Sequence, residues 1–247
     1  MSMATLIPGL RFGGRNLVAA RVMSKHLSLV VLSGLVTTIL ASAQGTPRLD
    51  AAAVWQMPGG FVANAQTACG SSSSPQFGDC VTTQMAKAGA SPASVSFTRE
   101  LYKQNHGEVG FMTTFQPGTP VDIAWVTYSW RPDHQYGLLL LNGQPGIVNV
   151  EDLTLLDRKS MQQSFQYKDL QNEFPKLDIF PGDRDGTTWP ESQAGPNGGT
   201  GFVLSYPLRN GCATCANAGS AIFTWNFNKQ GKFVGTSFQG MTPAPLN

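Results

Sequence analysis

The sequence predicts an α+β fold in a single domain, with a mainly antiparallel β-sheet and about three helices packed on one side. Two observations carry this prediction. Apolar residues recur at helical spacing in three stretches, at about 77–88, 92–102 and 159–174. The other apolar runs are short, alternate with polar residues and are separated by turn residues, as strands are. Strands that follow one another in sequence favour antiparallel pairing, with the helices on one side of the sheet.

The first 43 residues predict an export leader rather than part of the domain. After Met23 come a short basic start, the apolar run 27–40 and the small residues Ala41-Ser42-Ala43, which is the layout of a signal peptide over 23–43. The apolar run is shorter than the about 20 residues that span a bilayer. Residues 1–22 hold three arginines and no acid, and we interpret them as a start-site extension, with an organelle transit peptide as the alternative. We therefore expect an exported protein, periplasmic or extracellular.

The rest of the chain predicts one globular unit with no affinity for nucleic acid. We expect a flexible lead-in over 44–53, the domain over 54–242 and a tail over 243–247, because this length suits one core. Four of the 17 basic residues precede Gln44, which leaves 13 against 15 acidic residues. A nearly neutral chain without a Lys/Arg run lacks the charge that nucleic-acid binding needs. No later stretch is long and apolar enough to span a membrane.

The predicted helices have recognisable ends. The first begins at Phe77 and should stop at Gly89, a residue type that favours the position after a helix. Ser91-Pro92 supplies an N-cap followed by proline at the first helical position, and this second helix should reach about residue 102. The third covers 159–174 and is closed by a proline.

The predicted strands form hairpins. The runs EVGFMTTFQ (108–116) and VDIAWVTYSW (121–130) flank a Pro-Gly-Thr-Pro turn, and YGLLLLNGQPGIVNV (136–150) contains Asn142-Gly143, a strong hairpin signal. Pro145 favours an edge position for the strand that follows it. GFVLSYPL (201–208) and a closing hairpin complete the set. In that hairpin the alternate residues Ala221, Phe223, Trp225 and Phe227 share one face, which we interpret as sheet core.

The closing hairpin follows a C-x-x-C pair, Cys212 and Cys215. Covalent haem needs His directly after the second Cys, and Ala216 stands there. A zinc site needs about four ligands, and two Cys with His106 and His134 match no familiar zinc spacing. A thioredoxin-type site needs a helix start at the motif, whereas a strand pattern follows here. We therefore expect a disulfide.

The four cysteines allow three pairings. Locality favours Cys69 with Cys80 and Cys212 with Cys215, since C-x-x-C partners need little rearrangement to meet. Cross-pairing would close a much longer loop, and on a chain-entropy model closing that loop is worth about 5 kcal/mol.

The stretch YPLRNGCATCANAGSAIFTWNFNKQGKFVGTSF resembles the C-terminal end of an uncharacterised group of exported bacterial proteins. Their pattern reads Y-P-L, G-C-x-x-C-A, an F-x-F strand and G-x-F-x-G. GEVGFMTTF, VDIAWVTYSWR and GLLLLNG are similar to the same group, so the likeness covers about residues 54–240. Asn228 stands where the group commonly has an acid. The resemblance implies export and a single domain, and it implies no activity.

One loop between predicted strands is the candidate ligand site. The segment SWRPDHQYG gathers Trp130, Arg131, Asp133, His134 and Tyr136. Aromatic rings beside charged groups suit a sugar, an aromatic molecule or an anion. The alternative is a solvated loop whose rings cover the edge of the sheet.

Other candidate sites are less specific. Residues 180–199 form a long Gly/Pro-rich loop in which Asp183 and Asp185-Gly186 are a fragment of a calcium loop without its later ligands. Glu100 and Glu108 are a carboxylate pair whose separation the sequence does not fix. No nucleophile elbow or phosphate loop occurs. We expect neither metal nor cofactor.

Two functions remain. The first is a non-catalytic, disulfide-stabilised domain that binds a small molecule, a glycan or an envelope component. The alternative is a secreted hydrolase or a thiol-redox enzyme that uses the C-x-x-C.

Overall fold

The structure is a computed structural model that describes residues 48–132, 135–182 and 184–244. The expected start-site extension, signal peptide and first part of the lead-in lie outside the described residues, as do the last three residues of the expected tail. In the segments that the structure describes, none of the helices has the length and apolar character needed to cross a membrane.

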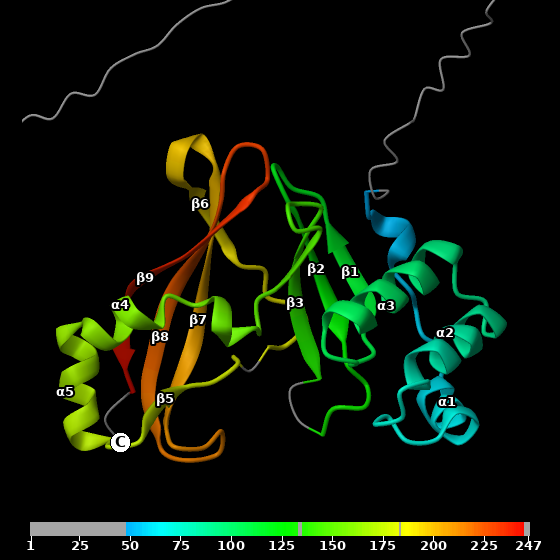
Figure 1. The fold of residues 1–247 in the computed structure, drawn as a ribbon, viewed down its shortest axis with the longest axis horizontal. Helices are drawn as coiled ribbons and strands as arrows, with labels where there is room; N and C mark the ends of the chain where they lie inside the picture. The colour runs from blue at the N-terminus through cyan, green and yellow to red at the C-terminus, as the bar shows by residue number, and fades with distance from the viewer. Residues whose placement is uncertain (1–47, 133–134, 183, 245–247) are drawn as a thin grey trace, which may run out of the picture. The chain divides into compact units, whose positions relative to one another are not determined.

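Two antiparallel sheets form the framework (Figure 1). The first has the order β1-β2-β3-β4 and the second the order β5-β7-β8-β9, with β6 paired to β7. The strands of the first sheet are β1 (Phe111–Gln116), β2 (Asp122–Thr127), β3 (Tyr136–Leu141) and β4 (Ile147–Asn149). Those of the second are β5 (Leu177–Ile179), β6 (Glu191–Ala194), β7 (Thr200–Asn210), β8 (Asn217–Phe227) and β9 (Phe233–Pro243). Every strand pair is antiparallel, which confirms the predicted α+β fold.

The main core lies between the two sheets, because alternate residues of each strand point to opposite faces. On β2, Ile123 and Trp125 join a cluster with the second sheet, while Ala124 and Val126 belong to a cluster under the helices. The predicted stripe on β8 is fully buried in the first cluster, at Ala221, Phe223, Trp225 and Phe227. Two neighbouring polar groups are satisfied there, since Trp225 Nε1 donates to Tyr206 Oη and Tyr206 donates to the Val150 carbonyl.

The helices are more numerous than expected. Three lie beside the first sheet (Figure 1): α1 (Phe61–Cys69), α2 (Phe77–Lys87) and α3 (Pro92–Gln104). We did not expect α1, which starts after a left-handed Gly60 with no side-chain cap. The single helix expected over 159–174 is two, α4 (Arg158–Gln163) and α5 (Phe165–Glu173), because Ser164 is extended and caps α5. Short 3₁₀ turns occur at η1 (Ala51–Ala53), η2 (Leu153–Leu155) and η3 (Pro196–Gly198).

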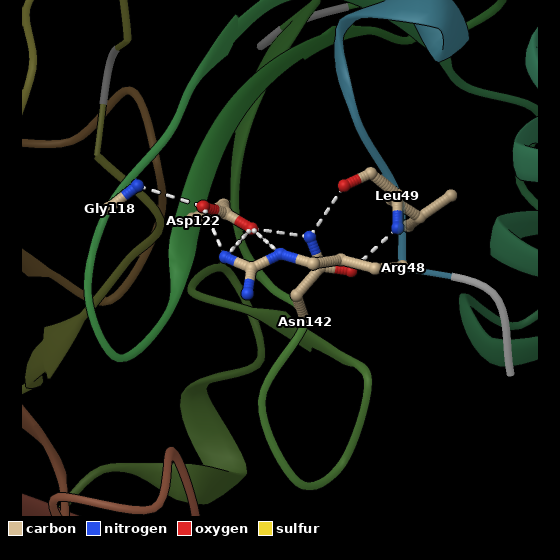
Figure 2. Close-up of polar contacts among 5 residues, drawn as sticks. All are labelled: Arg48, Leu49, Gly118, Asp122 and Asn142. Carbon is tan, nitrogen blue, oxygen red and sulfur yellow. Dashed lines mark hydrogen bonds and ion pairs between the residues drawn. The ribbon is translucent and has the colours of Figure 1, made fainter. Parts of the chain in front are cut away.

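The segment before η1 is tied to the first sheet (Figure 2). Arg48 donates from Nε and Nη2 to the carboxylate of Asp122 at 2.8–3.2 Å, and the Gly118 N–H donates to the same carboxylate at 2.8 Å. The Asn142 side chain accepts from the Leu49 N–H and donates to the Leu49 carbonyl, at 2.7 Å each, and it also donates to Asp122. Arg48 and Leu49, within the expected lead-in, are therefore hydrogen-bonded to the first sheet and to the turn that follows β3.

Both disulfides join cysteines that are close in sequence. Cys69 at the end of α1 is bonded to Cys80 on α2, so the bridge ties these two helices together. Cys212 and Cys215 are bonded to each other in the turn between β7 and β8. These are the pairs that locality favoured.

Candidate functional site

A cavity of about 710 Å³ lies beside the end of α3 and the Arg131 loop. One wall is apolar and comes from α3, β4, η2 and the start of β9; it includes Leu101, Ile147, Val148, Leu153, Leu155 and Phe233. The other wall is polar and comes from the end of α3, the Arg131 loop and the end of β4; it includes Asn105, His106, Glu108, Arg131, Asn149, Glu151 and Asp152. Small-molecule sites commonly combine this size with an apolar lining and a few converging polar groups.

The end of α3 places the first polar residues. The helix stops at Asn105, whose N–H donates to the Leu101 carbonyl, and the chain then turns through His106 and Gly107 at positive φ. The Gly107 N–H donates to the Tyr102 carbonyl, which closes the helix in the manner of a left-handed C-terminal turn. This reversal brings Glu108 back beside Asn105, whose amide donates to it at 2.8 Å.

Arg131 is the centre of the polar wall and contacts two carboxylates. It donates from Nε and Nη2 to Glu108 at 3.1 and 2.5 Å, and from Nη1 to Glu151 at 2.6 Å. Its side chain is 19% exposed, Glu108 is 43% exposed and Glu151 only 5%. Burial disfavours the cation, but the hydrogen bonds and charges of Glu108 and Glu151 outweigh it and raise the pKa of Arg131. The guanidinium therefore stays charged.

A chain of amides connects the carboxylate of Glu108 to the backbone of Glu151. Asn149 donates to the Asn105 side chain at 2.8 Å, and Asn105 donates to Glu108. The Glu151 N–H donates to the Asn149 side-chain oxygen at 2.9 Å, which fixes the strand end that carries Glu151. The polar wall is thus preorganised, because each of these side chains is held by at least one neighbour.

Tyr128 lies beneath Arg131, whose guanidinium carbon is 3.7 Å from the centre of the ring. The ring is 1% exposed. Burial raises the pKa of Tyr128 well above its ordinary value, and the charge of Glu151 raises it further, although Arg131 opposes this. The phenol is therefore neutral and can donate a hydrogen bond. Its oxygen has no hydrogen-bond partner within the described residues.

A smaller cavity of about 170 Å³ is also lined by Arg131 and Glu108. Its remaining walls include the rings of Phe77, Tyr128 and Trp130. Trp130 packs edge-on against Phe77, with ring centroids 5.0 Å apart. The Arg131–Glu108 pair is therefore shared by an aromatic cavity and the large one.

The candidate loop is divided by the structure. Arg131 lines the large cavity, whereas Trp130 faces the aromatic side and helps to bury Phe77. Tyr136 is 40% exposed at the start of β3 and lines neither cavity. Asp133 and His134 lie outside the described residues. Sequence reasoning missed Asn105, Asn149 and Glu151, because they come from separate segments. The signal for Glu151 was a carboxylate that directly follows a short apolar strand.

The other candidates do not form sites of comparable definition. Asp185 accepts hydrogen bonds from the Thr188 hydroxyl and from the backbone N–H groups of Thr187 and Thr188, which lower its pKa, so it acts as a turn residue. Glu100 and Glu108 line different cavities. Across residues 48–132, 135–182 and 184–244, no three His, Cys, Asp or Glu side chains are grouped as a metal site.

Comparisons of this chain with protein-family models, with curated proteins and with solved structures find no match. The site is therefore interpreted from its own geometry.

Proposed function

We propose that this protein is an exported, non-catalytic binding protein that takes a small organic molecule into the cavity beside Arg131. The observation that carries this proposal is one cavity of about 710 Å³ that is lined both by apolar side chains and by a preorganised set of polar side chains. The apolar wall offers burial to a hydrocarbon or ring, and the polar wall offers orientation. Among the described residues, Glu108 and Glu151 hold Arg131 in place, so the polar side chains are positioned before a ligand enters.

Export is supported by three features. The leader has the layout of a signal peptide, and the resemblance to exported bacterial proteins points the same way. Both disulfides suit an oxidising compartment, where such bonds persist. Cell fractionation with N-terminal sequencing tests this part of the proposal, and a protein that stays in the cytoplasm with its leader intact would contradict it.

Thiol-redox chemistry at Cys212 and Cys215 is less well supported. The pair lies in a turn between two strands, and no helix N-terminus is there to lower a thiol pKa. We therefore assign this bridge a structural role.

The binding proposal is tested with three single-ring probes of equal size, namely benzylamine, benzyl alcohol and benzoate. Titration is followed by NMR of the ¹⁵N-labelled protein, with the side-chain amides of Asn105 and Asn149 as reporters. We expect at least one probe to shift these signals in the wild type and to shift them much less in Leu153→Trp, which narrows the apolar side of the cavity. Gln239→Trp, at an exposed position of β9, is the matched control and should bind as the wild type does. The proposal fails if no probe moves the reporters, or if Leu153→Trp responds like the control.

A further inference from the structure

The polar wall of the large cavity carries more negative than positive charge. Three carboxylates line it, from Glu108, Glu151 and Asp152, whereas Arg131 is the one Lys or Arg side chain among its described lining residues. Arg131 is already bonded to two of the three. A second cation that enters the cavity would meet an attractive field, since opposite charges in a partly buried site interact more strongly than in water.

Glu151 provides a second, independent indication. Its side chain is 5% exposed, and its Oε2 accepts from Arg131. Its other oxygen, Oε1, is buried and has no hydrogen-bond partner in the described part of the chain. A buried carboxylate oxygen without a donor is costly, and an ionised carboxylate can only accept hydrogen bonds. A hydrogen-bond donor would satisfy Oε1 of Glu151, and an ammonium supplies such a donor together with the opposite charge.

The apolar lining of the cavity indicates the chemical character of the rest of the ligand. Leu153 and Phe233 are half-buried and pack against the core cluster that also contains Val148. They leave apolar surface facing the cavity, and covering it with a ring or an alkyl group is favourable by about 25 cal/mol for each Å² buried. The ligand therefore has two ends of different character.

Resting on the binding function proposed above, we propose that the cavity binds a cationic amphiphile, an amine that carries an apolar group, through the carboxylate of Glu151. The ammonium lies at the polar wall near Glu151 and Asp152, and the apolar group lies against Leu153 and Phe233. An anion is disfavoured at the same place, because Arg131 is already paired with two carboxylates.

A rival interpretation starts from Arg184. Its guanidinium lies 5.6 Å from the centre of the Tyr206 ring, and its Nε and Nη2 lack hydrogen-bond partners among the described residues. Such a group suits an anion. Arg184 does not belong to the lining of the large cavity, however, so the charge of this wall is set by the carboxylates.

The three single-ring probes test the ligand class, because benzylamine, benzyl alcohol and benzoate differ in charge at nearly constant shape. We expect benzylamine to bind about tenfold more tightly than benzyl alcohol at low salt, with benzoate weakest. Glu151→Gln keeps the size of the side chain and should reduce the ratio of benzylamine to benzyl alcohol affinity to about threefold or less. Benzyl alcohol affinity should change less than about twofold. Glu173→Gln, at an exposed position of α5, is the matched control and should leave the ratio unchanged.

The outcomes separate the two proposals. Equal binding of benzylamine and benzyl alcohol would overturn the cationic ligand and leave the binding function standing. Preference for benzoate would also overturn it. Absence of binding by all three probes would refute the binding function itself. If Glu151→Gln does not fold, Glu108→Gln and Asp152→Asn each remove one charge from the same wall, and an unchanged ratio in both overturns the inference.

Discussion

Arg48→Ala should destabilise this protein far more than an exposed arginine normally does. The Arg48 side chain is 63% exposed, but its partner Asp122 is 1% exposed and receives three of its hydrogen-bond contacts from Arg48. Removing one member of a fully buried ion pair costs about 3–5 kcal/mol, whereas exposed pairs contribute about 0–1 kcal/mol. Asp122 keeps donors from Gly118 and Asn142, and water can replace part of the guanidinium. We therefore expect a loss of about 2–3 kcal/mol in the free energy of unfolding.

The assay is urea unfolding followed by circular dichroism, with Arg99→Ala as the matched control. Arg99 also pairs with an aspartate, but its closest distance to Asp79 is 4.0 Å and the two side chains are 47% and 82% exposed. Arg99→Ala should change the stability by less than about 0.5 kcal/mol. For a domain of this size, the expected loss in Arg48→Ala corresponds to a fall in Tm of about 4–12 °C.

A double-mutant cycle isolates the contact. Once Asp122→Asn has removed the carboxylate, the further change Arg48→Ala should cost less than about 1 kcal/mol, because the two residues are coupled. If Arg48→Ala matches Arg99→Ala in the wild-type background, the lead-in is not docked in solution and the reasoning is refuted.

Three further predictions concern other parts of the fold. In a spectrophotometric titration, Tyr128, Tyr167 and Tyr206 should stay protonated above the pH range in which tyrosines of the unfolded chain ionise, because burial raises the pKa of each. The stability gained from the neutral phenols is present below about pH 10 and is lost as the pH rises through the raised pKa values. Three tyrosines that ionise in the native protein as they do in urea would contradict this. Thr188→Val should raise the pKa of Asp185, measured by NMR, because the Thr188 hydroxyl stabilises the anion. The contribution of Asp185 to stability is present above about pH 4 and declines as the pH falls through its lowered pKa. A pKa that the substitution leaves unchanged would show that the contact is absent. Replacing Cys212 and Cys215 by Ser should lower the free energy of unfolding by about 2 kcal/mol, and replacing Cys69 and Cys80 should lower it by about 3 kcal/mol, since the second pair closes the longer loop. Both variants should still melt cooperatively. A reversed order of the two Tm values would argue against loop entropy as the cause.

The local parts of the fold could be predicted because their signals are local. Asn142-Gly143 marked a hairpin, and the structure places Asn142 at positive φ between β3 and β4. Ser91-Pro92 marked the start of α3. The division of the strands between two sheets had no such signal, since periodicity shows that a residue is on a strand and says nothing of the strand's partners. Helix α1 was missed because it has nine residues and buries only Phe61 and Ala65, which leaves little helical periodicity to recognise.

The candidate site was predictable only in part, for the same reason. Arg131 stood out beside aromatic residues in one loop, and it does line the cavity of about 710 Å³. Its partners Glu108 and Glu151 are 23 and 20 residues away in sequence, on segments joined only by the folding of the first sheet. Asp122 was unremarkable within an apolar strand, although a buried carboxylate demands a partner. The arginine that satisfies it lies 74 residues earlier.

The double hydrogen bond between Leu49 and Asn142 also sets an order of events during synthesis. Leu49 leaves the ribosome 93 residues before Asn142 does. Translation adds about 5–20 residues per second, so several seconds pass between the synthesis of the lead-in and the completion of its binding site. That site is complete only after β2 and β3 have been made. Throughout that interval the segment is undocked and open to any processing enzyme or chaperone. Docking of the lead-in therefore depends on residues from the middle of the chain. A ribosome that stalls before residue 142 would leave the lead-in of its nascent chain undocked.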